Sequence, residues 1–265
     1  MNFRIAMYKI ERARELISEI NLLQAESPAY TYCLETDTQK GQRATFAKKN
    51  QIDLDKLVIR CGDVFHNLRS ALDQAYFESV TPHIPESSFG AIQFPFSKAE
   101  SKLDSTIQSR LAHKVSDDFV EVIRQVKPYS GSGGNLLLNL IHEINIIDKH
   151  KLPIPVGDFT RISSEQLRAQ IPDFPEGMVD CGFGCNGRDV VWSGRFFDVK
   201  FLGDIVPPTN TLFHKNLDVP VGLNFSFPNE RYFEPVIETL NKMANEVERI
   251  LNLMSEALPK KTKIL

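Results

Sequence analysis

Titratable side chains gather densely in two otherwise apolar stretches of this sequence. The first stretch, residues 54–80, contains the run from His66 to Asp73, and the second, residues 135–150, contains His142-Glu143 and Asp148-Lys149-His150. Histidine titrates near neutral pH, and a neighbouring carboxylate can orient it as a general base, while an arginine can stabilise negative charge on a substrate. The residues that these stretches offer for catalysis are Arg60, His66, Arg69, Asp73, Asp148 and His150.

The first stretch has the periodicity of an amphipathic helix, because its apolar residues recur at steps of three and four. Asp53 is expected to cap its N-terminus, and Thr81-Pro82 is expected to end it, since proline has no amide hydrogen. His66, Arg69 and Asp73 lie three and four residues apart and therefore share one face of this helix. Ile59 and Phe77 lie on the same face, so we do not expect it to be an ordinary solvated one.

The second stretch is apolar nearly all round, which predicts a central helix that is buried on several sides. An unpaired charge in such a helix costs several kcal/mol, roughly 3–5 kcal/mol when one partner of a buried pair is lost. The polar side chains of this helix, His142, Asp148 and His150, should therefore have partners. The natural partners are His66, Arg69 and Asp73, so we expect the two helices to be in direct contact.

Three functions fit this polar group. It could be a general acid/base site, or a satisfied network that fixes the register of the helices. A metal site is the third alternative, because imidazole and carboxylate suit zinc, iron or manganese. The sequence lacks the His-x-x-x-His or Glu-x-x-His spacing of a specific metal site. We therefore expect no bound metal and no cofactor.

Charge and composition exclude several classes of protein. A net charge of −3 over 265 residues gives no general attraction to nucleic acid or to anionic membranes. RNA, the candidate partner, would need a local basic patch, and the basic residues near the site are Arg60, Arg69, Lys149 and Lys151. No apolar run reaches the roughly 18 residues of a membrane span. We expect neither a secretory signal at the beginning of the sequence nor a disulfide framework among the four cysteines. We expect a cytoplasmic protein that does not enter a membrane, with a homodimer as its candidate assembly.

The order of the expected elements indicates an α+β fold. A helix over residues 2–25 precedes a β-hairpin over residues 30–47, and both belong to a helical-bundle core of residues 1–151. A short helix over residues 116–126 is expected to be capped by Ser116. Residues 152–228 form an inserted antiparallel β region, with strands expected at residues 152–156, 178–183, 189–192, 195–201 and 221–227. Residues 229–258 form a last helix that returns to the bundle, and its inner stripe is Val236, Leu240, Met243, Val247, Ile250 and Met254. The glycine-rich loop at residues 128–134 is interpreted as a linker, with a phosphate-binding loop as the alternative.

The run from Gly62 to Asp73 has companions further along the chain: Phe94-Pro95-Phe96, Lys127-Pro128-Tyr129 and Ile147-Asp148-Lys149-His150. Together they resemble a family of uncharacterised bacterial proteins over residues 1–155, and this resemblance implies no activity.

Arg60 and His66 also resemble the Arg-x(4–6)-His motif of HEPN domains, helical bundles that include metal-independent ribonucleases. That resemblance implies RNA cleavage with His66 as the base and Arg60 or Arg69 as the phosphate-stabilising group. Cys61 stands where the family usually has a polar residue. The competing hypothesis is a non-catalytic binding or assembly module whose polar network is structural.

Overall fold

The computed structural model of the chain describes residues 3–37, 42–147, 155–158, 169, 190–194, 198–201, 211–217, 222–225 and 235–259. The chain forms two compact units. The helical unit comprises Met1–Ile20, Ile59–Pro153 and Ile237–Leu265, and the sheet unit comprises Asn21–Val58 and Ile154–Val236. Both units are therefore assembled from segments that lie far apart in the sequence.

Helices dominate the described residues. The α-helices are α1 (Arg4–Glu26), α2 (Gln51–Val80), α3 (Leu103–Ser109), α4 (Asp117–Val126), α5 (Leu136–Ile147) and α7 (Val236–Ala257). Short 3-10 helices lie between them: η1 (Thr81–His83), η2 (Glu86–Ala91), η3 (Glu100–Lys102) and η4 (Ala112–Lys114). None of the helices in the described part of the chain is both long and apolar enough to cross a membrane.

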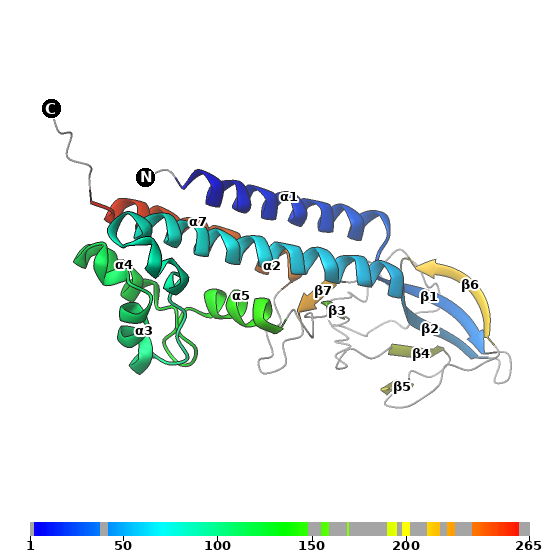
Figure 1. Ribbon diagram of the computed structural model, residues 1–265. Coiled ribbons are helices and arrows are strands. Elements are labelled where there is room, and N and C mark those ends of the chain that lie inside the picture. Colours follow the sequence, from blue (N-terminus) through cyan, green and yellow to red (C-terminus); the bar gives the residue numbers. More distant parts are fainter. Residues whose placement is uncertain are drawn as a thin grey trace. The chain divides into compact units, whose positions relative to one another are not determined.

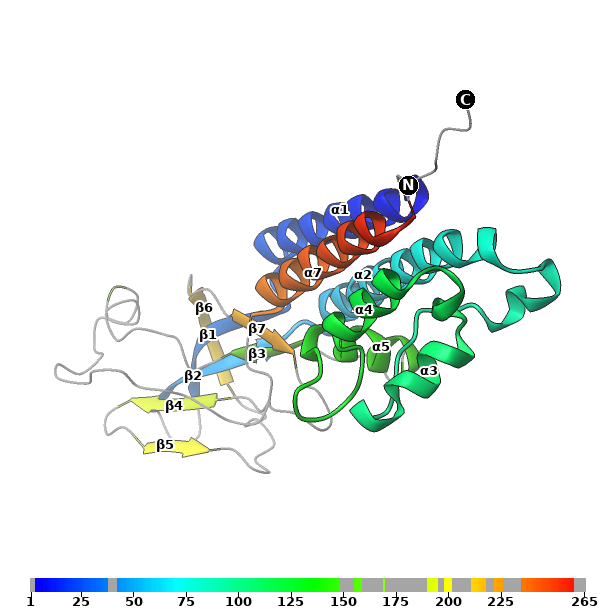
Figure 2. The same ribbon diagram turned by 90° about the vertical axis from the view of Figure 1, so that its left-hand side faces the viewer.

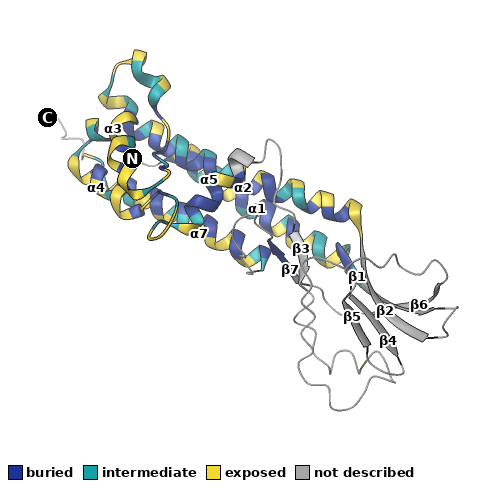
Figure 3. Cartoon of the chain, turned by 90° about the horizontal axis from the view of Figure 1, so that it is seen from below, coloured by how far each residue is buried: buried dark blue, intermediate teal, exposed yellow. Residues whose placement is uncertain are grey.

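In the helical unit, α1, α2 and α7 lie side by side, as both Figure 1 and Figure 2 show. Their facing sides carry the buried residues, which appear dark blue in Figure 3. All six residues predicted for the inner stripe of α7 are buried, namely Val236, Leu240, Met243, Val247, Ile250 and Met254. A polar contact reinforces the packing, because Arg14 of α1 binds Glu248 of α7 at 2.6 Å.

The beginning of α2 differs from the prediction. Asn50 is the residue that precedes the helix, and its side-chain oxygen accepts from the backbone N–H of Asp53 at 3.4 Å. Asp53 lies in the first helical turn, where its carboxylate accepts from the side chains of Asn50, Ser27 and Lys56. The hydrogen bond from Lys56, followed by that from Ser27, lowers the pKa of Asp53. The N-cap is thus Asn50 and not Asp53. The carboxylate of Asp53 accepts a hydrogen bond from the side chain of this cap.

The end of α2 and the cap of α4 agree with the sequence. Thr81 and Pro82 form η1 directly after Val80, where α2 ends. Ser116 caps α4, because its hydroxyl oxygen accepts from the backbone N–H of Phe119 at 3.1 Å. The same hydroxyl donates to the carbonyl of Ala257 at 3.3 Å. The cap therefore also joins the start of α4 to the end of α7.

The sheet unit contains a five-stranded antiparallel sheet in the order β5-β4-β2-β1-β6 and a two-stranded sheet β3-β7. The strands are β1 (Tyr30–Asp37), β2 (Gln42–Lys49), β3 (Pro155–Asp158), β4 (Val190–Gly194), β5 (Asp198–Phe201), β6 (Thr211–Leu217) and β7 (Gly222–Phe225). The predicted hairpin is β1 and β2, which pair from Tyr30–Lys49 to Asp37–Gln42.

The hairpin has a different place from the one expected. Its two strands occupy the middle of the five-stranded sheet, where β1 also pairs with β6 and β2 with β4. The hairpin thus belongs to the same sheet as strands from the predicted insertion, because each of its outer edges needs a hydrogen-bonding partner. β6 was not predicted, and the strand predicted at residues 178–183 lies outside the described residues.

Candidate functional site

The polar group on α2 is centred on Arg69, whose side chain is 10% exposed. Its Nε donates to Oδ2 of Asp73 at 2.9 Å, and its Nη2 donates to Oδ1 at 3.1 Å. This is a two-pronged ion pair between residues one helical turn apart, the geometry that suits a planar guanidinium. Nη1 lies 2.7 Å from Nδ1 of His142 on α5. Arg69 therefore joins the two helices that were predicted to be in contact.

An aromatic ring completes this group. The guanidinium carbon of Arg69 lies 4.1 Å from the ring centroid of Phe96. Phe96 in turn stacks on the imidazole of His142, with centroids 4.3 Å apart and planes 5° from parallel. A cation over an aromatic face is attracted to the electrons of the ring. We call Arg69, Asp73, Phe96 and His142 the Arg69 cluster.

The segment that carries Phe96 is fixed by hydrogen bonds of its own. Oδ1 of Asp73 accepts from the backbone N–H of Phe94 at 2.9 Å. Next to Phe96, the N–H of Ser97 donates to the carbonyl of Pro128 at 2.8 Å, and Ser97 forms a parallel bridge with Tyr129. The run from Phe94 to Ser97 is thus held between α2 and the loop before α5, which positions the ring of Phe96.

His142 is the titratable member of the Arg69 cluster. Burial, followed by the positive charge of Arg69, lowers its pKa to about 4, although the negative charge of Asp73 acts in the opposite direction. The imidazole is therefore neutral at pH 7, and it accepts a hydrogen bond from Arg69. A group with this pKa is a weak base, so it is poorly suited to remove a proton from a substrate hydroxyl at neutral pH.

His66 lies outside the Arg69 cluster. It is on the same helix as Arg69, one turn earlier, and its side chain is exposed. Asp63 and Ile59, further along this side of α2, are also exposed, Ile59 to 59%. This part of the helix surface is solvated, which differs from the expectation that the face shared by His66, Arg69 and Asp73 is not an ordinary solvated one.

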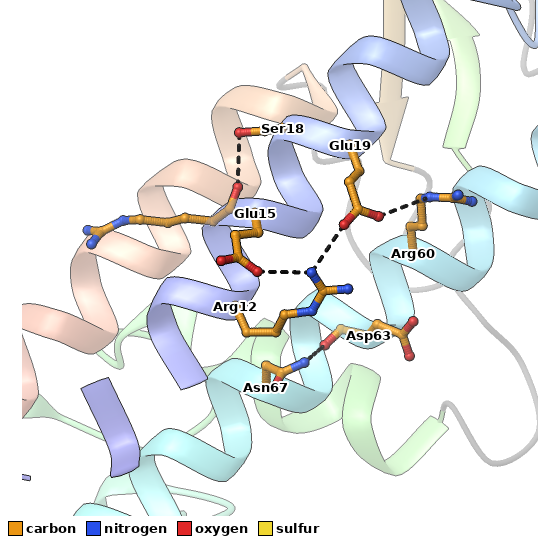
Figure 4. A network of polar contacts seen from close by, with 8 residues as sticks. Arg12, Glu15, Ser18, Glu19, Arg60, Asp63 and Asn67 are labelled. Carbon is orange, nitrogen blue, oxygen red and sulfur yellow. Dashed lines mark hydrogen bonds and ion pairs between the residues drawn. The ribbon is translucent and has the colours of Figure 1, made fainter. Parts of the chain in front are cut away.

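Arg60 has a carboxylate partner in a separate network at the contact of α1 and α2, drawn in Figure 4. Its Nε lies 3.6 Å from Glu19, which also accepts from Arg12 at 3.1 Å. Arg60 and His66 are six residues apart, a spacing that places them about 120° apart around a helix. The adjacent Cys61 is fully buried, and burial raises the pKa of its thiol to about 12, so it is not a nucleophile.

Asp148 and His150 lie outside the described residues, so their predicted contacts with His66 or Arg69 stay a prediction. Across the part of the chain that the structure describes, no group of three His, Cys, Asp or Glu residues is arranged to hold a metal ion.

The loop before α5 uses its amides internally. The N–H of Gly134 donates to Gly131, and that of Asn135 donates to Lys127 at 2.9 Å. The N–H of Leu138 donates to the side chain of Asn135, which caps α5. A phosphate-binding loop needs such amides free to point at the ligand. The arrangement favours the linker interpretation.

Sequence reasoning did not place His142 or Phe96 among the site residues. His142 was expected only to need a partner, and its signal was the cost of a polar residue in an apolar helix. Phe96 has no polar atom, so nothing in its residue type points to a site.

Comparison of the chain with known protein families, curated proteins and solved structures found no match. The function proposed for the chain is therefore argued from its own geometry.

Proposed function

We propose that this protein is a non-catalytic binding or assembly module of the α+β class, in which the Arg69 cluster fixes α2, α5 and the Phe94–Ser97 segment in one register. The observation that carries this proposal is the way in which the Arg69 guanidinium is bonded, with three of its five N–H groups engaged. Each of its three nitrogens has a partner, two on Asp73 and one on His142.

The remaining bonds of the cluster point to the same role. Both carboxylate oxygens of Asp73 accept from Arg69, and Oδ1 also accepts from the backbone of Phe94. A substrate phosphate would have access to a side chain that is only 10% exposed and already paired with a carboxylate. Buried polar groups of this kind are costly when one member is removed, and they specify one arrangement of the elements they join.

The test replaces the shape of the cation and keeps its charge. Arg69→Lys retains a positive charge but cannot form the two-pronged pair with Asp73 and reach His142 together. We expect a loss of about 2 kcal/mol in the free energy of unfolding, measured by urea denaturation. Arg4→Lys, the same change at an exposed position in the first turn of α1, is the control. Equal stability of Arg69→Lys and the wild type would overturn the structural role.

A metal-independent, HEPN-like ribonuclease is the second candidate, and the exposure of His66 favours it, because a substrate can reach this side chain. His66 would act as the base towards a ribose 2′-hydroxyl, with Arg60 stabilising the phosphate. The two candidates differ in one assay. Purified protein is incubated with mixed RNA and chelator, beside His66→Gln. Cleavage by the wild type and not by the variant establishes the ribonuclease, whereas no cleavage by either leaves the module.

Cytoplasmic location and homodimerisation belong to the same proposal. Light scattering coupled to size-exclusion chromatography measures the assembly directly. A mass of one chain over the micromolar range would remove the homodimer from the proposal.

A further inference from the structure

The contact between Arg69 and His142 defines the protonation state of the imidazole. A guanidinium carries only donors, so the 2.7 Å approach of Nη1 requires a lone pair on Nδ1 of His142. The ring is therefore neutral, with its proton on Nε2. Protonation of Nδ1 would remove the acceptor and place a second cation against Arg69.

Few charges surround the imidazole to offset that second cation. Within the described residues, α2 presents Arg69 and Asp73, and the Phe94–Ser97 segment presents the uncharged ring of Phe96. On α5 itself, Glu143 follows in sequence and is exposed. Asp73 already accepts three hydrogen bonds, from Arg69 and Phe94. A protonated His142 would thus meet repulsion from Arg69 without gaining a free carboxylate.

The polar contacts of α5 are distributed unevenly along its length. At its start, Asn135 donates to Glu246 of α7 at 2.6 Å, and Asn139 donates to the carbonyl of Tyr129. Neither contact involves a group that titrates between pH 4 and pH 7 on the α5 side. Further along, the polar contact that the described side chains make is the one between His142 and Arg69. Buried apolar side chains lie in both halves, Leu138 in the first and Ile144 in the second, so it is the polar contacts of the two halves that differ in chemistry.

We propose that His142 is an acid-sensitive latch, whose protonation releases the C-terminal half of α5 and the Phe94–Ser97 segment from α2 while the first half of α5 stays bound to α7. The proposal deepens the structural role assigned to the Arg69 cluster and rests on it. Burial and Arg69 keep the pKa of His142 near 4, so the latch is closed at neutral pH and opens in acid.

Hydrogen exchange on the full chain tests the latch at pH 7 and at pH 4, after correction for the intrinsic pH dependence of exchange. We expect exchange of residues 143–147 to rise by at least about tenfold at the lower pH, because this half of the helix then opens locally. Peptides covering α4 and residues 135–139 should keep their protection. A wild type without this local step overturns the proposal.

Two variants identify the group whose protonation causes the rise in exchange, which we call the acid-induced step. His142→Asn keeps an acceptor near the position of Nδ1 and does not titrate, so the step should disappear. His83→Gln, at an exposed position in η1, should retain it. A step that persists in His142→Asn would show that another group titrates.

Nitrogen NMR of the wild-type imidazole provides a readout that needs no variant. Nδ1 should be unprotonated at pH 7, and a proton on Nδ1 would overturn the proposal even if His142→Asn does not fold. The latch and the structural role can fail separately. Unchanged stability of Arg69→Lys removes the structural role. A destabilised Arg69→Lys, together with a wild type that shows no acid-induced step, removes the latch alone.

Discussion

Arg69 on α2 and His142 on α5 meet through a single hydrogen bond of 2.7 Å, although they are separated by 73 positions in the chain. The same two side chains lie against Phe96, one by a cation–aromatic contact and the other by ring stacking. Three segments of the helical unit therefore converge on one guanidinium.

Asp73→Ala should destabilise the protein by about 2–3 kcal/mol, less than a fully buried pair would lose, because the Asp73 side chain is 36% exposed. The substitution leaves Arg69 without its carboxylate and the N–H of Phe94 without an acceptor. Urea denaturation measures the loss. Asp63→Ala, at an exposed position of the same helix, should change the free energy of unfolding by less than about 0.5 kcal/mol. A wild-type midpoint for Asp73→Ala would mean that the carboxylate is not structural.

The stability of the protein should decrease in mild acid. The folded-state pKa of His142 is about 4, below the ordinary value of 6.5, so the unfolded chain binds a proton at this residue more readily than the folded one. The contribution of neutral His142 to the free energy of unfolding is fully present above pH 6.5, and it is lost progressively as the pH falls to 4. We expect it to amount to about 2 kcal/mol, after allowance for the partial solvent exposure of the ring.

Unfolding free energies at half-unit pH intervals from 7 to 4 measure this dependence. The difference between the wild type and His142→Asn isolates the contribution of His142, since the carboxylates are common to both proteins. A constant difference across this range would contradict the prediction.

Gly134→Ala should be much more harmful than Gly90→Ala. A methyl group at Gly134 would lie 1.9 Å from the carbonyl oxygen of Tyr129, a backbone atom that cannot move aside cheaply. At Gly90 the same methyl group meets nothing within 4 Å. We expect a loss of about 2 kcal/mol or more for Gly134→Ala and a change within about 0.5 kcal/mol for Gly90→Ala. Thermal melts of the two variants side by side provide the comparison, and equal melting temperatures would refute it.

Ser116→Ala should cost about 1 kcal/mol, because α4 loses its N-cap. Ser116→Asp separates the two roles of this residue. Aspartate can still accept from Phe119, but it cannot donate to the carbonyl of Ala257. If the cap dominates, Ser116→Asp is more stable than Ser116→Ala by differential scanning calorimetry. Equal stability of the two variants, which both lack the donor to Ala257, would assign the effect to the bond with α7.

Local signals in the sequence predicted the buried face of one helix and the end of another. The stripe from Val236 to Met254 predicted the buried face of α7, and the step into Thr81 and Pro82 predicted the end of α2. The start of α2 was less well defined, because Asn50 and Asp53 are both residues that favour caps. The apolar stripe begins at Leu54, which favours Asp53 as the cap. The helix itself begins earlier, with Gln51 and the exposed Ile52, so its start does not coincide with the start of the stripe.

Non-local partners account for what the sequence did not predict. Periodicity placed His66, Arg69 and Asp73 on one face, but it does not determine which turn a neighbouring helix covers. α5 reaches Arg69, while His66, one turn earlier, is exposed. Similarly, Thr211–Leu217 has no clean alternation of apolar residues and is a strand because it pairs with β1.

The central place of the β1–β2 hairpin in its sheet has a consequence for synthesis of the chain on the ribosome. β2 pairs with β4, and the partner residues Arg43 and Gly194 are separated by on the order of 150 residues. At roughly 5–20 residues per second, the hairpin exists for on the order of ten seconds before that partner is made. During this time both of its outer strands present unpaired backbone groups, which are templates for pairing with another chain. We expect crowding of nascent chains on one messenger RNA to promote strand exchange at this hairpin before any other part of the protein.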